Sequence, residues 1–277
     1  MTESTFATLS GGQSHFISAG TDRVHYVTAG RGRHTLVFIH GWACNLGFWR
    51  ELVAALADHA RLILIDLPGH GESDKPKTAY SLDFFANAVL AVLRAEGVEK
   101  ATVIGHSMGA AVLCRVLQKA PEKIAALVSV DGLLCRPPGS PAEGLALVSG
   151  FGSPHYREHA AGFIRTFFPF PGAETLREQI TAEMLKTPQH VMLGGMLALL
   201  SPDQPDWALS KVDGPVLVIN APRPWWSSAY ENYVHSLSPQ AEYRMMDGAS
   251  HFPMLEKPVE FNALLTSMLR KHDLIGP

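Results

Sequence analysis

The chain has 277 residues, 47% of them hydrophobic, which is enough for one main α/β domain that carries an insertion. Its 23 Lys and Arg residues nearly balance 26 Asp and Glu residues, and the net charge of −3 gives no reason to expect nucleic acid or an anionic membrane as a partner. We find no basic, apolar leader and no run of the roughly 18 apolar residues that a membrane span needs. The three cysteines show no metal-ligand spacing, so we expect a cytoplasmic protein without a bound metal.

Short apolar runs alternate with helical patterns along much of the chain. The expected strands are an opening hairpin at 15–17 and 24–27, then 36–39, 62–65, 101–104, 126–130, 216–219 and 242–246. The expected helices are 47–58, 81–96, 107–119 and a last helix that begins near Pro258. Continuously apolar strands are typical of a parallel sheet that is covered on both faces. The order therefore predicts an α/β fold with a mostly parallel sheet flanked by helices.

This alternation stops after Asp131 and resumes at Pro215. The segment between them is rich in Pro, Gly, Phe and Met, as in Phe167-Phe168-Pro169-Phe170-Pro171. A strand–helix unit needs no such insertion, so we expect a helical cap over the carboxyl ends of the strands. We predict a core of residues 1–131 and 215–277 and a cap of residues 132–214, inserted after the sixth strand. Most of the cap's aromatic and Met side chains should pack inside the cap, and only some should face a substrate.

One pentapeptide, Gly105-His106-Ser107-Met108-Gly109, lies between an apolar run and a helical pattern. A G-x-S-x-G sequence in this context is typical of a nucleophile elbow. The two glycines let strand and helix approach closely, and the strained turn raises the Ser107 hydroxyl clear of the sheet. The alternative is an ordinary Gly/Ser turn.

A serine hydroxyl becomes a good nucleophile when a base takes its proton, and an acceptor must hold that base in one tautomer. We choose His251 as the base, because it lies in a loop after the last expected strand. His106 is adjacent to Ser107 and should point elsewhere, so we place it in the substrate pocket together with Phe252. We expect His70 to stabilise a turn.

The developing oxyanion needs two hydrogen-bond donors. One is the backbone N–H of Met108, which follows the nucleophile at the start of a helix. The other is the backbone N–H of Trp42, in His40-Gly41-Trp42 at the end of strand 36–39, with the Trp42 indole as a pocket wall.

Four motifs in this order resemble the α/β-hydrolase family, specifically capped esterases of the aryl-esterase and perhydrolase types. They are His40-Gly41-Trp42, Asp66-Leu67-Pro68-Gly69-His70-Gly71-Glu72-Ser73, Gly105 to Gly109, and His251-Phe252-Pro253 through Glu256-Lys257-Pro258. The resemblance implies the α/β-hydrolase fold with an eight-stranded sheet, Ser107 as nucleophile, His251 as base, and Trp42 with Met108 as oxyanion donors. A serine nucleophile disfavours the dehalogenase and epoxide-hydrolase branches, which use Asp.

The family usually places its acid just after the strand that ends here at Ile219, yet residues 220–226 contain no carboxylate. We assign the acid to Asp131, because it ends the strand beside the nucleophile strand and should emerge at the same edge of the sheet. Asp247 is the alternative, although Asp247-Gly248 also resembles a turn. A weak Ser–His dyad, or a protein that binds without turnover, would also fit. Trp225 and Trp226 fill the usual place of the acid, and we expect them to form pocket wall.

The residues thus predict a cofactor-independent serine hydrolase that cleaves a carboxylic ester or lactone through an acyl-enzyme. Its partner would be a small molecule with an apolar acyl or aryl group. Lactonase, C–C bond hydrolase and amidase activities on the same triad are alternatives within this chemistry. A non-catalytic ligand-binding homologue is the alternative from another class, and the sequence does not decide between a monomer and a homodimer.

Overall fold

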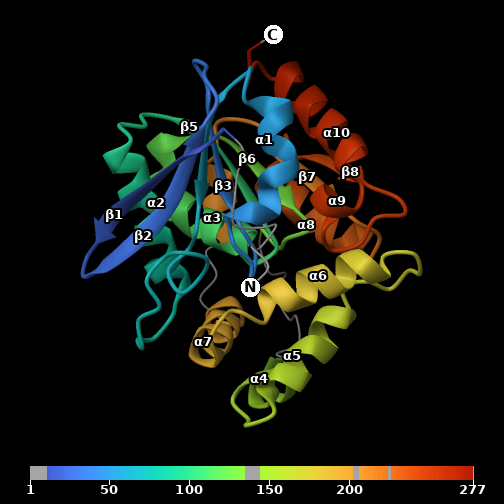
Figure 1. Cartoon of the computed structure of the whole chain (residues 1–277). Coiled ribbons are helices and arrows are strands. Elements are labelled where there is room, and N and C mark those ends of the chain that lie inside the picture. Colours follow the sequence, from blue (N-terminus) through green and yellow to red (C-terminus); the bar gives the residue numbers. More distant parts are fainter. Residues whose placement is uncertain (1–10, 135–143, 202–205, 224–225, 277) are drawn as a thin grey trace.

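Eight strands form one sheet in the computed structural model, which describes residues 11–134, 144–201, 206–223 and 226–276 (Figure 1). The strands are β1 (Gln13–Ala19), β2 (Asp22–Ala29), β3 (Thr35–Ile39), β4 (Arg61–Ile65), β5 (Ala101–His106), β6 (Ile124–Val130), β7 (Val216–Asn220) and β8 (Glu242–Met245). Their order across the sheet is β1-β2-β4-β3-β5-β6-β7-β8. The pairs β1–β2 and β2–β4 are antiparallel and the other pairs are parallel, which confirms the mostly parallel eight-stranded sheet expected from the sequence.

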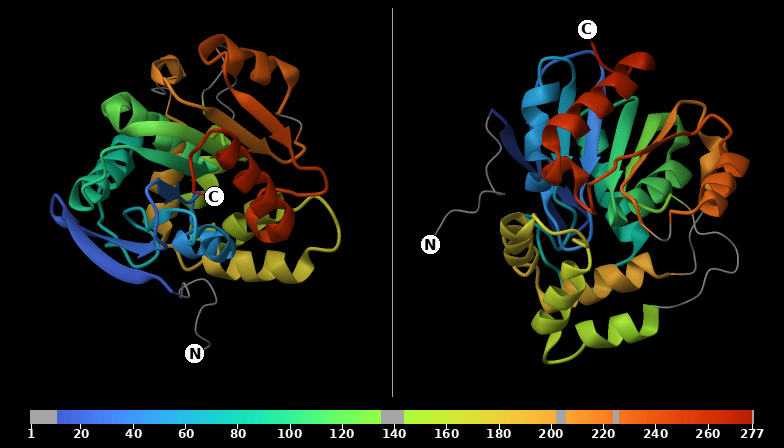
Figure 2. Two further views of the ribbon diagram at one scale, coloured as in Figure 1. Left: turned by 90° about the horizontal axis from the view of Figure 1, so that it is seen from above. Right: turned by 90° about the vertical axis from the view of Figure 1, so that its right-hand side faces the viewer.

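Helices cover both faces of this sheet, with α1 and α10 on one side and α2, α3 and α8 on the other (Figure 2). The helices of the core are α1 (Arg50–Leu56), α2 (Leu82–Ala95), α3 (Met108–Lys119), α8 (Ser228–Leu237), α9 (Pro253–Glu256) and α10 (Pro258–Lys271), with 3₁₀ turns η1 (Leu46–Trp49), η2 (Pro121–Lys123) and η3 (Asp206–Lys211). Every residue of β5 and of β7 is buried. These strands are apolar without alternation because both of their faces meet helices.

Two expected helices differ at their ends. The helix predicted at 47–58 begins as η1, where the Asn45 side chain caps the turn by accepting from Gly47 N, and continues as α1. The helix predicted from 107 begins at Met108, because Ser107 has a φ of 53° that no α-helix accommodates.

Four further helices, α4 (Gly144–Phe151), α5 (Tyr156–Arg165), α6 (Glu174–Met184) and α7 (Gln189–Leu199), follow β6 and precede β7. They gather below one end of the sheet as Figures 1 and 2 show it. The Trp42 indole N–H donates to the Met192 carbonyl of α7 over 2.8 Å and so ties these helices to the core. The helical insertion after the sixth strand is confirmed, while its limits at 132 and 214 stay a prediction.

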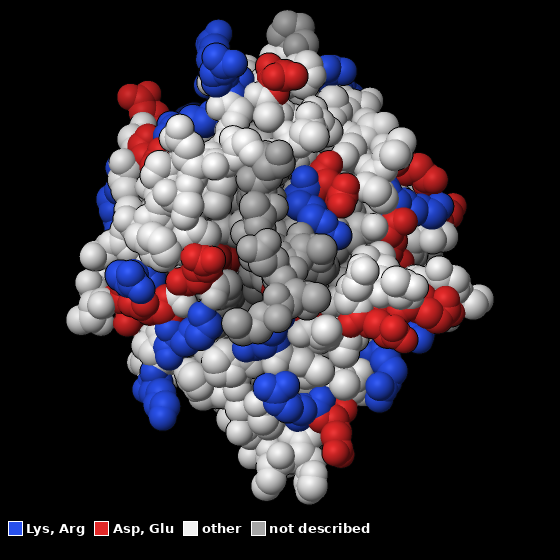
Figure 3. Space-filling view, in the orientation of Figure 1, with Lys and Arg blue, Asp and Glu red and all other residues white. Residues whose placement is uncertain are grey.

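Among the described residues, no helix is both long and apolar enough to cross a membrane. On the face shown in Figure 3, acidic and basic side chains lie interspersed over the surface. A nucleic acid is held by clustered positive charge, and this face does not present such a cluster.

Candidate active site

Ser107 lies at the sharp turn between β5 and α3, with φ 53° and ψ −117°. A side chain other than glycine adopts such a conformation at a cost of about 1–3 kcal/mol, which the surroundings must offset. A Cβ atom added at Gly105 would lie 2.5 Å from the Gly109 carbonyl oxygen, and one at Gly109 would lie 2.4 Å from the Ile39 carbonyl oxygen. Both glycines are therefore required for strand and helix to pack this closely around the elbow.

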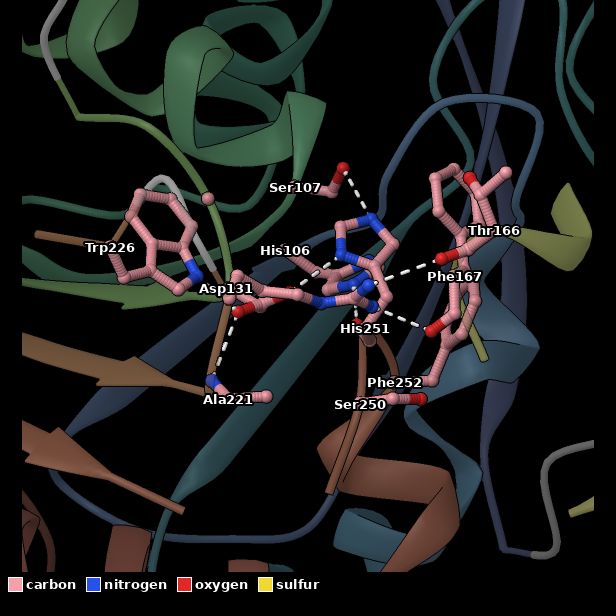
Figure 4. Close-up of polar contacts among 12 residues, drawn as sticks. His106, Ser107, Asp131, Thr166, Phe167, Ala221, Trp226, Ser250, His251 and Phe252 are labelled. Atoms are coloured by element: carbon pink, nitrogen blue, oxygen red, sulfur yellow. Dashed lines mark hydrogen bonds and ion pairs between the residues drawn. The ribbon is translucent and has the colours of Figure 1, made fainter. Parts of the chain in front are cut away.

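A chain of hydrogen bonds joins Ser107, His251 and Asp131 (Figure 4). The Ser107 hydroxyl lies 2.9 Å from His251 Nε2, and His251 Nδ1 lies 2.7 Å from Asp131 Oδ2. Asp131 follows β6, which pairs in parallel with β5, so both strands deliver their last side chains to one edge of the sheet. The Ser107 backbone N–H also donates to the Val130 carbonyl over 3.0 Å, which fixes the two strand ends together.

Asp131 is 2% exposed, and its second oxygen, Oδ1, accepts from the Ala221 N–H at 3.0 Å and from the Trp226 indole N–H at 2.7 Å. Burial raises the pKa of this carboxyl, but the hydrogen bonds and the charge interaction with His251 outweigh it and hold the pKa below its usual value. The ionised carboxylate accepts from His251 Nδ1, so the lone pair of Nε2 faces the Ser107 hydroxyl.

Asp247, the alternative acid, is exposed. Its backbone carbonyl accepts from Lys257 Nζ over 3.0 Å. The structure thus brings Asp131 to His251, and it gives the histidine a carboxylate partner that a Ser–His dyad would lack.

The loop around His251 is held by Glu256 and His106. The Glu256 carboxylate accepts from the Ser250 N–H at 3.0 Å, the Ser250 hydroxyl at 2.6 Å and the Phe252 N–H at 2.9 Å. His106 Nε2 donates to the His251 carbonyl over 2.7 Å. Burial lowers the pKa of His106 to about 3, so its ring is neutral. Backbone groups on both sides of His251 therefore have fixed partners.

The segment that follows β3 lies directly behind the nucleophile, since a Cβ atom on Gly41 would come 3.1 Å from Ser107 Cβ. It forms a tight turn in which the Cys44 N–H donates to the Gly41 carbonyl over 3.2 Å and Ala43 has a φ of 54°. The Met108 N–H belongs to the first turn of α3, where amides have no acceptor within the helix. The oxyanion roles of Trp42 and Met108 stay a prediction.

An apolar pocket of about 200 Å³ opens on Ser107. It is lined by Trp42, Cys44, His106, Ser107, Phe163, Phe167, Met184, Met196, Leu199, Leu200, His251 and Phe252. His106, Phe252 and the Trp42 indole lie where the sequence predicts them, and cap residues close the opposite side. The Phe167 ring comes 4.4 Å from the His251 ring, measured between centroids.

The prediction that Trp225 and Trp226 form pocket wall is not confirmed for either residue. Trp225 lies outside the described residues. Trp226 does not belong to the described pocket lining; it lies on the opposite side of Asp131 from His251 (Figure 4), because its indole N–H is used to hold that carboxylate.

His70 lies buried in the segment that follows β4. His70 stabilises a turn, as predicted, because its Nδ1 bonds the Pro68 carbonyl at 3.0 Å and its own carbonyl accepts from the Ser73 N–H at 3.0 Å. In the part of the chain that the structure describes, no three His, Cys, Asp or Glu side chains are grouped to hold a metal ion.

Sequence reasoning missed the roles of Arg223 and Glu256. Arg223 donates to two cap carbonyls, and nothing in its local sequence predicts that contact. Glu256 lies in the stretch from His251 to Pro258, and its spacing of five residues from His251 is the signal that could have found it.

A profile of the family described as alpha/beta hydrolase fold matches residues 34–180, more than half of the chain. The chain belongs to the α/β-hydrolase fold family. This hydrolase is 30% identical to the pimeloyl-(acyl-carrier protein) methyl ester esterase of Sodalis glossinidius over 258 residues, which cover 84% of the chain and 93% of the relative. The esterase RhEst1 from Rhodococcus sp. ECU1013 has a similar crystal structure, with a TM-score of 0.79 and 26% identity over 95% of this chain and 99% of that one.

A third relative is a longer protein. The hydrolase is 31% identical over 252 residues to the dihydrolipoyllysine-residue acetyltransferase component of the acetoin cleaving system of Pseudomonas putida. The match covers 88% of this chain and 65% of the relative, so the chain spans just under two thirds of that relative's length.

Proposed function

We propose that this α/β hydrolase is a cofactor-independent serine hydrolase that cleaves carboxylic esters, lactones included, with a small apolar acyl or aryl group. The observation that carries the proposal is the hydrogen-bonded series Ser107–His251–Asp131, which opens on an apolar pocket. Relatives that are esterases by name support the ester as the bond cleaved.

In the first half of the reaction, Ser107 Oγ attacks the carbonyl carbon while His251 Nε2 takes the hydroxyl proton. The negative charge that develops on the carbonyl oxygen is stabilised by the N–H groups of Trp42 and Met108, and each such donor contributes roughly 3 kcal/mol. The ester C–O bond then breaks, and the imidazolium returns the proton to the departing alkoxide. Asp131 stabilises the imidazolium throughout.

In the second half, His251 takes a proton from water, and the hydroxide that forms attacks the acyl-enzyme. The proton returns to Ser107 Oγ and the acid leaves. With a lactone, the alcohol stays attached to the acyl group and the product is a hydroxy acid. Amide and C–C bonds remain alternative targets of the same residues, because the pocket rather than the triad decides among them.

The non-catalytic alternative was based on the missing carboxylate after β7. Asp131 supplies a carboxylate 2.7 Å from His251, which removes the reason for that alternative and supports an active enzyme. We also propose a cytoplasmic location, to which the buried thiol of Cys44, which forms no disulfide, is suited.

The test is hydrolysis of p-nitrophenyl esters from acetate to decanoate by the wild type and by Ser107→Ala. We expect turnover in the wild type, loss of at least about 10³-fold in the variant, and an optimum at short to medium chains. A fluorophosphonate should label the wild type and not the variant. Turnover that survives in folded Ser107→Ala would show that another group is the nucleophile.

A further inference from the structure

Arg223 follows β7 and reaches across to the cap. Its Nη1 donates to the Thr166 carbonyl over 3.2 Å and its Nη2 to the Phe167 carbonyl over 2.6 Å. Figure 4 shows these two carbonyl groups on the His251 side of the site, where the dashed lines reach them.

Thr166 is the C-cap of α5 and Phe167 is the next residue, so both carbonyls lie at the helix end that carries partial negative charge. A guanidinium group suits that position, because it is always charged and presents several N–H groups in a fixed plane. Arg223 thus caps a helix of the insertion from a loop of the core.

The residue that Arg223 holds is part of the pocket. Phe167 lines the cavity beside Ser107, and its ring lies 4.4 Å from the ring of His251. The Phe167 carbonyl also accepts from the His251 N–H at 3.4 Å. One cap residue therefore contacts the base through its ring and its backbone, while Arg223 fixes its place.

The neighbouring aromatic rings do not replace this link. Phe167 packs edge-on against Phe163 of the cap, 4.9 Å between centroids, and against Phe252 of the core, 5.9 Å between centroids. Apolar ring contacts are non-directional and allow sliding, whereas two hydrogen bonds to successive carbonyls set both the height and the rotation of the segment.

We propose that Arg223 is a positioning residue that fixes the Phe167 wall of the acyl pocket and so determines which esters the enzyme accepts. The proposal rests on the proposed ester hydrolysis. It assigns specificity to the loop after β7, which holds no carboxylate. Ala221 and Trp226 of this loop hold Asp131, and Arg223 reaches the cap.

The test compares Arg223→Met, Arg223→Lys and the control Arg157→Met, which removes the same charge from an exposed position at the start of α5. For p-nitrophenyl acetate, butyrate and octanoate we expect Arg223→Met to change the ratio of kcat/KM for long over short esters by about tenfold, mainly through KM. Labelling of Ser107 by the small reagent diisopropyl fluorophosphate should stay within about threefold of wild type. Arg223→Lys should restore part of the selectivity, because an ammonium group reaches one carbonyl but not both.

Hydrogen exchange supplies a readout that does not depend on ester hydrolysis. We expect amides of residues 163–168 to exchange at least about tenfold faster in Arg223→Met and at the wild-type rate in Arg157→Met. If the wild type cleaves no ester in the series while this exchange rises, the positioning role holds and the proposed function fails. Unchanged selectivity in folded Arg223→Met overturns the proposal. An equal loss of kcat/KM on all esters, together with loss of labelling, also overturns it, because Arg223 would then support the Asp131–His251 pair instead of the pocket wall.

Discussion

At the scale of single residues, the acid of this site depends on strand adjacency. Asp131 directly follows β6, the neighbour of the nucleophile strand, and His251 Nδ1, in the loop after β8, lies 2.7 Å from its carboxylate. The loop after β7 contributes the Ala221 N–H to the same carboxylate. The loop after β7 therefore contributes a backbone hydrogen bond to the acid, although it contains no carboxylate itself.

This arrangement predicts different results for two aspartates. Asp131→Asn should reduce kcat by about 10⁴-fold, because a neutral amide does not stabilise the imidazolium and its N–H₂ group favours the wrong His251 tautomer. Asp247→Asn, at an exposed position, should leave kcat within about twofold. Steady-state hydrolysis of a p-nitrophenyl ester by both variants measures this. The reverse pattern would make Asp247 the acid.

The sheet itself places two of the candidate residues near each other. Ser107 and Asp131 follow adjacent parallel strands, so their proximity could be inferred from the apolar runs. Trp226 was assigned to the pocket because it fills the usual place of the acid, but its indole N–H bonds Asp131. Whether a tryptophan turns toward a cavity or toward a carboxylate depends on packing several residues away, which a local pattern does not contain.

At the scale of elements, the loop between β8 and α10 works as one unit. Glu256 in α9 accepts from the backbone on both sides of His251, through the N–H groups of Ser250 and Phe252. Hydrogen bonds to a charged acceptor contribute about 1.5–3 kcal/mol each. Helix α9 thus fixes the position of the His251 imidazole through Glu256.

We therefore expect Glu256→Gln to lower kcat by about tenfold with little change in KM, since its amide has one acceptor oxygen for donors on both sides. Fluorophosphonate labelling should slow by a similar factor. Glu260→Gln is the control, because Glu260 lies on the next helix with a side chain 64% exposed. A rise in KM at constant kcat would instead mean that Glu256 shapes the pocket.

The cap shows where sequence reasoning ends. The helical insertion was predictable from the break in strand–helix alternation. The sequence also shows that this insertion is rich in aromatic and Met side chains, among them Phe163, Phe167, Met184 and Met196. Which of them face Ser107 was not predictable, because they lie on three different segments, α5 with the turn after it, α6 and α7, and their directions depend on how these segments pack over the sheet. Arg223 helps to set the position of the turn after α5 from 56 residues beyond Phe167 in the sequence.

At the scale of the whole molecule, the same burial that builds the site makes stability depend on pH. His70 and His106 are fully enclosed, and burial lowers the pKa of each to about 3. Burial also lowers the pKa of His40. All three rings are neutral in the folded protein at pH 7, and each is exposed to water and free to take a proton when the chain unfolds.

The sign of the effect follows from proton binding. Below the ordinary histidine pKa of about 6.5 the unfolded chain binds protons that the folded chain refuses, so the free energy of unfolding falls as the pH falls from about 6.5 toward 3. Each of His70 and His106 contributes up to about 1.4 kcal/mol per pH unit. The pKa values of Asp66 and Asp131 are lowered in the folded protein. These two residues add to the loss of stability only below about pH 4, where the unfolded chain protonates its carboxylates while the folded chain keeps them ionised.

Urea unfolding at pH 7, 6, 5 and 4.5 measures this dependence, and we expect a plateau near pH 7 with a decline that steepens below pH 6. His70→Gln, whose amide can still donate to the Pro68 carbonyl, should reduce the slope by about one proton. His155→Gln, at an exposed position, is the matched control. A free energy of unfolding that stays constant from pH 6.5 to 4.5 would mean that these histidines take up protons in the folded protein as well. His106 would then not be neutral where it donates to the His251 carbonyl.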